Sequence, residues 1–293
     1  MAKLIKKSFE PKDYERVCDF LIELNKDNKE HINWNWARFE WMHEHPETNK
    51  ELLPYIGLWW EENKVVGACL FDMYFGEAFC GALPKYLHIL KDIYEYAYDN
   101  LKDENGLGVS INIDNKKEIQ LAESLGYKIS DNSETILKID LSNDISYSLP
   151  NGLKIISYDP KDHLSEFQWV LYQGFDHGDD YEEFKKEEIT ETGRDKYREH
   201  FNPYLSVAVI NENGEAVSYC SLWYLPQTDY AYIEPVCVIP SYRKLGLGKA
   251  MIYECLKRVK EIGAKKAYVI SDQEFYYKIG FKEETLFKFY WKK

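Results

Sequence analysis

A short stretch near the end of the chain, IPSYRKLGLGKAM at residues 239–251, places two glycines directly before a segment with helical periodicity. The first turn of a helix carries free backbone N–H groups and a partial positive charge, and glycines allow an anion to approach them closely. A P-loop is excluded because Ala250 follows Gly248 and Lys249 where Ser or Thr is required, and a dinucleotide loop because its third glycine is missing. The stretch therefore indicates a phosphate site of another kind, or a plain tight turn.

Regular elements on both sides hold this loop in place. The run DYAYIEPVCVI at 229–239 is typical of a strand, and the run AKKAYVI at 264–270 indicates a second, buried strand. Between them, apolar residues recur along one face at helical spacing, namely Leu247, Met251, Cys255 or Leu256, and Val259. The sequence thus predicts a strand, a glycine loop, a helix and a further strand in succession.

This succession resembles the GCN5-related N-acetyltransferase (GNAT) family. The family pattern is Arg or Gln, two residues, Gly, one residue, then Gly or Ala, and it is met by Arg243, Gly246 and Gly248. The family also has a tyrosine-containing helix that ends in Gly-Phe, which is met by Tyr276 and residues 280–281. The resemblance covers roughly the second half of the chain and, through an internal repeat described below, extends more weakly to the first half.

Acetyl-coenzyme A is the co-substrate that this resemblance implies, with no metal. Its pyrophosphate is expected on the backbone of the loop, at Arg243, Lys244, Leu245, Gly246, Leu247, Gly248 and Lys249. Its pantetheine arm is expected to pair with the preceding strand, at Val236, Cys237 and Val238. A backbone N–H of that strand would hold the thioester carbonyl. For the side chain of Arg243, a surface salt bridge is the alternative role.

Two proton transfers are needed when an amine attacks a thioester, because the amine must lose a proton and the departing thiolate must gain one. The resemblance implies that Tyr276 is the general acid, and a packed aromatic side chain is the alternative. The resemblance also makes Glu234, on the strand before the loop, a candidate base or acceptor contact, and a structural carboxylate is the alternative. Alternation places Glu234 on the same face as Val236 and Val238, but Pro235 predicts a bulge that could re-aim it. His177, on a loop, is a second candidate base.

An internal repeat organises the whole chain. Ser8–Asp13 matches Ser157–Asp162, and three further segments recur in the same order about 150 residues later. We therefore predict an α/β (α+β) fold of two tandem GNAT-like domains, each a mostly antiparallel mixed sheet flanked by helices. The domains are expected at 1–143 and 144–293, joined by a polar, turn-rich linker at 142–152.

The first copy of the repeat lacks the residues that carry the resemblance. Leu87 stands in place of the loop arginine, and Leu90 and Asp92 stand in place of the two glycines. The carboxylate of Asp92 would repel a phosphate, and Ala122 occupies the position of Tyr276. We expect the domain at 1–143 to be degenerate and non-catalytic, helping to shape the acceptor pocket, and the second domain to bind acetyl-CoA and to be catalytic.

The segment 30–47 is dense in aromatic residues, with Trp34, Trp36 and Trp41 among three histidines. These side chains could bind an aromatic or cationic acceptor, but the pattern favours packing in a core. His43 and His45 are two residues apart and would not share a helix face, which argues against a metal site.

The formal charge of −13 argues against a nucleic-acid partner, which needs a basic surface, and agrees with a cationic partner such as an amine. The six cysteines are scattered without a CxxC pair, no apolar run reaches about 18 residues, and the start of the chain lacks a signal-peptide core. These features indicate a cytoplasmic protein with reduced thiols and no membrane partner.

We predict an acetyl-CoA-dependent N-acetyltransferase that moves an acetyl group to a primary amine by direct attack, without a covalent enzyme intermediate. The alternative is a non-catalytic acyl-CoA-binding sensor or interaction protein, which would not need Tyr276. A small amine, an aminoglycoside, an amino acid or a peptide N-terminus remains open as the acceptor, as does transfer of a longer acyl group. No oligomeric state is assigned by the sequence.

Overall fold

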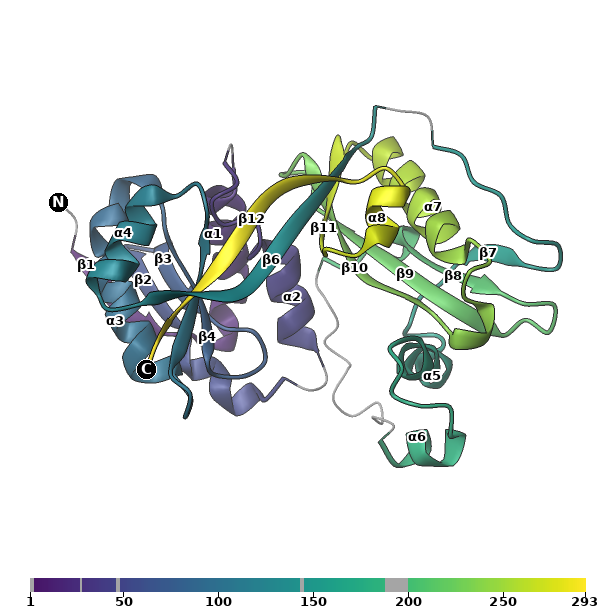
Figure 1. The fold of residues 1–293 in the computed structure, drawn as a ribbon, viewed down its shortest axis with the longest axis horizontal. Coiled ribbons are helices and arrows are strands. Elements are labelled where there is room, and N and C mark those ends of the chain that lie inside the picture. The colour runs from purple at the N-terminus through teal and green to yellow at the C-terminus, as the bar shows by residue number, and fades with distance from the viewer. Residues whose placement is uncertain (1–2, 27, 46–47, 143–144, 188–199) are drawn as a thin grey trace. The chain divides into compact units, whose positions relative to one another are not determined.

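The computed structural model describes residues 3–26, 28–45, 48–142, 145–187 and 200–293 (Figure 1). It contains two compact units. The first comprises Met1–Leu137, Ile270–Gln273 and Glu283–Lys293, and the second comprises Lys138–Val269 and Glu274–Lys282. Among the described residues, no helix has the length and apolar character that crossing a membrane would require.

The first unit contains a sheet with the strand order β1-β2-β3-β4-β5-β12-β6. Its strands are β1 (Leu4–Ser8), β2 (Gly57–Glu61), β3 (Lys64–Leu70), β4 (Glu77–Ala82), β5 (Leu107–Asn112), β6 (Lys128–Asp140, of which 128–137 belong to this unit) and β12 (Lys282–Lys292). Its helices are α1 (Tyr14–Leu24), α2 (Trp36–Glu44), α3 (Leu90–Leu101) and α4 (Lys116–Ser124), with 3-10 turns at Pro11–Asp13, Lys50–Tyr55 and Pro84–Ile89.

The second unit contains a sheet with the strand order β11-β10-β9-β8-β7. Its strands are β7 (Lys154–Ser157), β8 (Ser206–Ile210), β9 (Ala216–Tyr224), β10 (Tyr230–Val238) and β11 (Lys266–Ile270). Its helices are α5 (Leu164–Gly174), α6 (Tyr181–Glu187), α7 (Leu247–Glu261) and α8 (Glu274–Lys278), with 3-10 turns at Pro203–Leu205 and Pro240–Tyr242. Only the β10–β11 pairing is parallel, because a helix connects these two strands.

The two halves of the chain, β1 to β6 and β7 to β12, repeat the same order of elements: a strand, two helices, a hairpin, a strand, a helix, a strand, a helix and a strand. Equivalent backbone hydrogen bonds close equivalent positions. Leu83 N–H donates to Val66 O at 2.9 Å in the first unit, and Ile239 N–H donates to Val217 O at 3.1 Å in the second. The prediction of two tandem copies of one α/β unit is therefore confirmed.

The last strand of the chain does not stay with the second unit. β12 pairs antiparallel with β5, with Phe287 opposite Asn112 and Lys292 opposite Leu107, and Figure 1 shows it in yellow beside β6. The sequence-based division at 143/144 had placed this strand in the second domain. A strand pattern indicates a strand but not its pairing partner, which only the tertiary structure decides.

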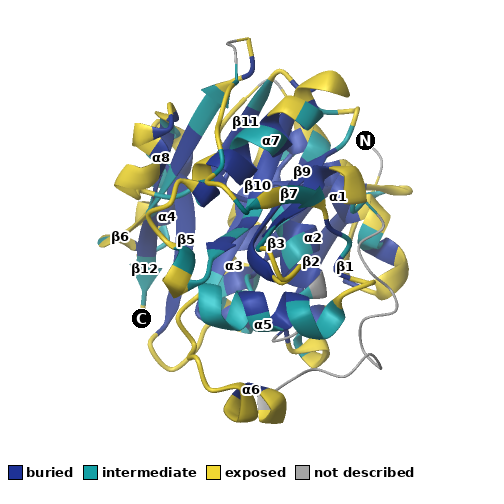
Figure 2. Cartoon of the chain, turned by 90° about the vertical axis from the view of Figure 1, so that its right-hand side faces the viewer, coloured by how far each residue is buried: buried dark blue, intermediate teal, exposed yellow. Residues whose placement is uncertain are grey.

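Hydrophobic faces hold each unit together, and Figure 2 shows the buried strands in dark blue against an exposed, yellow α6. All nine residues of β9 are buried, as expected for a central strand covered on both faces. The predicted apolar face of α7 is confirmed, since Leu247, Met251, Cys255, Leu256 and Val259 are all buried. In the first unit Trp34 and Trp36 are buried, as the core interpretation predicted, whereas Trp41 is half-buried.

Candidate functional site

Strands β10 and β11 separate part of the way along the second sheet. Their parallel pairing covers only Tyr230–Tyr232 and Lys266–Tyr268, although β10 continues to Val238. On its other edge, β10 remains paired with β9 at Val236, Cys237 and Val238. The edge that faces β11 thus has no partner among the described strands over these three residues. Apart from the oxygen of Val238, which accepts from the side chain of Arg243, its backbone groups can pair with an extended, amide-bearing ligand.

The loop after β10 leads into an uncapped helix. Lys244 and Gly246 have positive φ angles of 64° and 81°, and α7 begins directly after Gly246. A left-handed conformation at this position favours glycine, because a side chain would be strained there. No side chain of the described residues caps this helix. The first-turn N–H groups at Leu247–Lys249 therefore have no capping side chain within the described part of the chain, as an anion site requires.

Gly248 has a different reason to be a glycine. A Cβ atom at this position would lie 3.1 Å from the ring of Phe275 and 3.9 Å from a methyl group of Val238. The helix start, the end of β10 and the helix α8 therefore meet closely at this point. The tight-turn and phosphate-site interpretations are both supported, the first by Gly246 and the second by the uncapped helix.

The side chain of Arg243 binds the protein itself. Its Nε donates to Val238 O at 3.0 Å, and its Nη2 donates to Gly174 O at 3.0 Å and contacts Asp176 Oδ1 at 2.9 Å. This guanidinium thus joins the end of β10 to the end of α5. The salt bridge considered for this side chain is present, and the phosphate contact expected at the backbone of Arg243 stays a prediction.

Tyr276 and Glu234 interact in the second unit. Tyr276 is 8% exposed, and its ring packs edge-on against Phe275 and Phe281 at 5.1 and 5.6 Å. Burial raises the pKa of its hydroxyl, and the nearby carboxylate of Glu234 raises the pKa further. The hydroxyl therefore keeps its proton at neutral pH, as a general acid must. The sequence placed these two residues more than forty positions apart, and the fold brings them together.

A bulge in β10 presents Glu234. Ile233 lies opposite Leu222 and Val236 lies opposite Cys220, so Glu234 and Pro235 together face the single residue Ser221. The bulge predicted from Pro235 is confirmed. Glu234 is half-buried, as are Val236 and Val238, whereas the intervening residues of the strand are buried.

Two donors that the sequence analysis missed hold this bulge. Ser221 Oγ donates to the backbone oxygen of Glu234 at 2.6 Å, and Trp223 Nε1 donates to the same oxygen at 2.8 Å. Both lie on β9, for which the sequence pattern predicts only a strand of a hairpin. No local pattern could reveal them, because the register of β9 against a bulged partner is a tertiary property.

Cys237 and His177 are the remaining candidates in this unit. Burial raises the pKa of Cys237 to about 12, and its Sγ donates to Val170 O at 3.7 Å, so it remains a thiol at neutral pH. A buried thiol of this kind is a poor nucleophile. His177 is exposed on the loop after α5, with its ring 5.7 Å from the ring of Tyr172.

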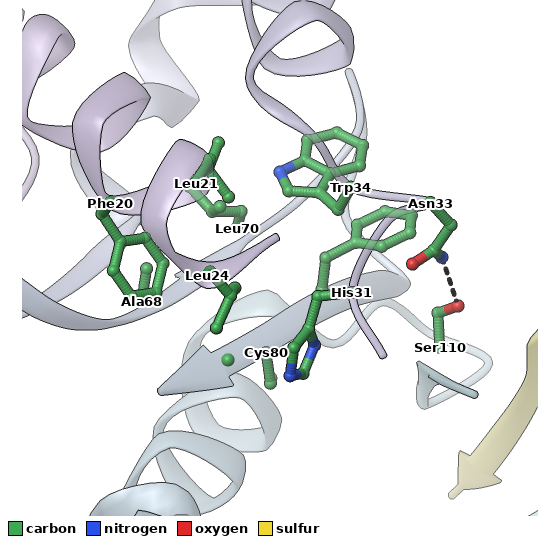
Figure 3. A pocket seen from close by; sticks show the side chains of 12 residues that line it. Phe20, Leu21, Leu24, His31, Asn33, Trp34, Ala68, Leu70, Cys80 and Ser110 are labelled. Atoms are coloured by element: carbon green, nitrogen blue, oxygen red, sulfur yellow. Dashed lines mark hydrogen bonds between the residues drawn. The ribbon is translucent and has the colours of Figure 1, made fainter. Parts of the chain in front are cut away.

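The first unit has the same separated strands, but side chains fill the gap. Its strands β4 and β5 pair only where Glu77 lies opposite Gly108 and Ala78 lies opposite Val109. Beyond this point Trp34 stacks on Phe79 with ring centroids 4.0 Å apart, and Asn33 donates to Ser110 Oγ at 2.8 Å (Figure 3).

The pocket that remains there is lined by these side chains together with His31 and has room for about one water molecule. Burial lowers the pKa of His31 to about 4, so its imidazole is neutral. The helix that follows, α3, carries Asp92 in its first turn. An arm like that of a coenzyme does not fit this filled pocket.

Comparison with known protein families gives one match. Residues 166–281 match the sequence model of the acetyltransferase (GNAT) family, a range that begins in α5 and ends directly after α8. A search of the curated proteins finds no match.

Several solved structures resemble the whole chain in fold. The tandem GNAT protein from the clavulanic acid biosynthesis pathway has a TM-score of 0.62 and 12% identity, with 98% of each chain covered. A GCN5-related N-acetyltransferase from Sphaerobacter thermophilus has a TM-score of 0.58 and 13% identity, covering 99% of this chain and 95% of its own. An acetyltransferase of the GNAT family from Colwellia psychrerythraea has a TM-score of 0.57 and 12% identity, covering 98% and 100%. At such low sequence identities, the similarity shows only that the fold is shared.

Proposed function

Since residues 166–281 belong to the acetyltransferase (GNAT) family, we propose that this chain is an acetyl-CoA-dependent N-acetyltransferase that acts on a primary amine. One observation carries the proposal. The open edge of β10 leads directly to the uncapped start of α7, and the interacting pair of Tyr276 and Glu234 lies in the same unit. An extended acyl donor with a pyrophosphate matches both parts of this surface.

Binding of the donor uses the backbone. The N–H groups at the start of α7 hold the pyrophosphate, where the helix dipole favours negative charge. Lys244 and Lys249 are exposed beside these groups and add positive charge. The open edge at Val236–Val238 pairs with the amides of the pantetheine arm, and one N–H there polarises the thioester carbonyl.

The acyl transfer is a direct attack. The carboxylate of Glu234 takes a proton from the acceptor ammonium, directly or through water, and the neutral amine forms the new C–N bond. The C–S bond then breaks, and Tyr276 donates its proton to the departing thiolate. The second proton of the attacking nitrogen leaves through water and restores the hydroxyl of Tyr276. Cys237, the cysteine of the open strand, does not form an acyl-enzyme because its pKa of about 12 keeps it protonated.

Only the second unit takes the donor in this proposal. In the first unit Leu87 and Asp92 replace the loop arginine and a glycine, and the gap between β4 and β5 is filled by Trp34 and Asn33. A carboxylate in the first turn of α3 also opposes phosphate binding. We therefore propose that the first unit is the degenerate copy and that it does no chemistry.

Coenzyme A binding tests the loop. Gly248→Asp copies the first unit and should lower the affinity at least about tenfold, because it adds a negative charge beside the phosphates. Gly248→Asn has the same size without the charge, and should retain more of the affinity than Gly248→Asp. Calorimetric titration of both variants with coenzyme A compares them. Equal affinities for the two variants and the wild type would exclude this loop as the phosphate site.

Thiol release in the presence of acetyl-CoA and a panel of amines tests the chemistry. We expect turnover with at least one primary amine. Tight coenzyme binding without turnover for any small amine, aminoglycoside, amino acid or peptide would instead support the acyl-CoA-binding sensor.

A further inference from the structure

The carbonyl group of Glu234 is held by two side chains at once. Glu234 lies in the bulge, where the regular pairing of β10 with β9 is interrupted, and a carbonyl that loses its ladder partner inside the protein is costly. One donor would remove that cost. Here the hydroxyl of Ser221 and the indole N–H of Trp223 both donate to it, at 2.6 and 2.8 Å, and so use both acceptor positions of the oxygen.

Both donors are rigid. Ser221 is fully buried and Trp223 is 1% exposed, and both belong to the central strand β9. Two fixed donors define the direction of one carbonyl, and hence the orientation of the peptide plane next to the Cα of Glu234. The direction in which the carboxylate of Glu234 leaves the strand depends on that plane.

The first unit provides an internal comparison. There β3 and β4 pair in regular register, from Gly67 opposite Ala82 to Leu70 opposite Phe79. Val66 and Val217 accept equivalent hydrogen bonds and therefore occupy equivalent positions. Leu70 and Ser221 lie equally far along the chain from them, so Leu70 occupies the position of Ser221. The β3–β4 pairing ends at Leu70. Leucine has no hydroxyl to donate, so the serine donor is present in the unit that has the glycine loop and is missing from the other.

We propose that Ser221 and Trp223 are positioning residues for the acyl transfer, which aim the carboxylate of Glu234 at the acceptor amine. The inference rests on the proposed function of Glu234. It extends the site to the central strand, where neither residue touches the substrates. It also explains why two buried donors serve one carbonyl, which stability alone does not require.

The test compares three serine variants in the full chain. Ser221→Ala removes one donor and should lower kcat about tenfold with an unchanged affinity for coenzyme A, since a base that is misplaced by a fraction of an ångström loses much of its effect. Ser221→Thr keeps the hydroxyl and should retain most of the activity. Ser218→Ala is the matched control: Ser218 is fully buried on the same strand, and its hydroxyl has no hydrogen-bond partner among the described residues.

A second readout is independent of turnover. In chains labelled with ¹³C at glutamate carboxyl carbons, the titration of Glu234 should move in Ser221→Ala but not in Ser218→Ala. Trp223→Phe keeps an aromatic ring, although a smaller one, and removes the indole N–H, so it replaces Ser221→Ala in the test if that variant does not fold. Positioning is overturned if the donor-removing variant matches Ser218→Ala in kcat, in the pH profile and in this titration.

The titration also separates this inference from the proposed function. If the wild type acetylates no amine but the Glu234 titration still responds to Ser221→Ala, the proposed function fails and the positioning of the carboxylate stands. If the wild type is active and the titration does not respond, the positioning role fails and the proposed function stands.

Discussion

Gly174 at the end of α5 lies directly against Cys237 on β10, so that a Cβ atom at Gly174 would be 2.7 Å from the Sγ of Cys237. The first unit has the same contact with the two roles exchanged. There the glycine is on the strand, and a Cβ atom at Gly81 would be 2.8 Å from a methyl group of Leu24 on α1. In both units the helix end approaches the neighbouring strand closely, and one partner must be a glycine for this to happen.

This contact predicts that Gly174→Ala destabilises the protein by about 1–3 kcal/mol through overpacking. The cost should fall in a Cys237→Gly background, which removes the opposing atoms and copies the arrangement of the first unit. Urea unfolding of the four chains of this double-mutant cycle measures the coupling. An equal cost of Gly174→Ala in both backgrounds would show that the two residues do not compete for space.

Tyr276→Phe removes the proton donor and should lower kcat about 100-fold with little change in coenzyme A affinity. Burial and the carboxylate of Glu234 both raise the pKa of this hydroxyl, so it stays protonated across the neutral range. We therefore expect this decrease in kcat at every pH from about 6 to about 9, with thiol release as the measurement. Tyr277→Phe, an exposed neighbour, is the control. Unchanged turnover in Tyr276→Phe would remove the general-acid role.

Glu118 in the first unit should make stability depend on pH. Its carboxyl is 2% exposed and accepts hydrogen bonds from Tyr94 Oη and Asn115 Nδ2, each at 2.7 Å. Burial raises its pKa to about 8 from 4.5. At pH values between about 4.5 and about 8, this carboxyl therefore keeps its proton in the folded state but has lost it in the unfolded state.

The stabilisation from Glu118 is complete below about pH 4.5 and is lost as the pH rises to about 8. Between these limits the free energy of unfolding should fall by up to about 1.4 kcal/mol per pH unit relative to Glu118→Gln. Urea unfolding across this range measures the difference. Glu123→Gln changes an exposed carboxyl of the same helix and should leave the pH dependence unaltered.

Removal of β12 should loosen the first unit. In a chain that ends at Lys282, β5 loses the partner that now covers Leu107–Asn112, and Asn112 loses its 2.8 Å hydrogen bond to Thr285. Hydrogen exchange of the β5 amides should accelerate, because they become an exposed strand edge. The amides of β8 and β9 in the second unit are the internal reference and should keep their protection. Uniform acceleration in both units would mean that they unfold together.

The sequence by itself determined the parts that depend on neighbours along the chain. The glycine loop, the amphipathic helix behind it and the bulge at Pro235 are local consequences of residue type, and the structure contains all three. The repeat predicted two copies of one fold. The replacement of loop glycines by Leu90 and Asp92 indicated which copy had lost its motif.

Only the tertiary structure decided which distant segments meet. It placed β12 beside β5, joined the side chain of Arg243 to Gly174 and Asp176, and aligned Ser221 and Trp223 with the carbonyl of Glu234. Side chains alternate along a strand whatever its partner, so a sequence pattern specifies that a strand exists but not its neighbour or its register. The pairing depends on packing over the whole sheet, and the pattern of a single segment does not contain it.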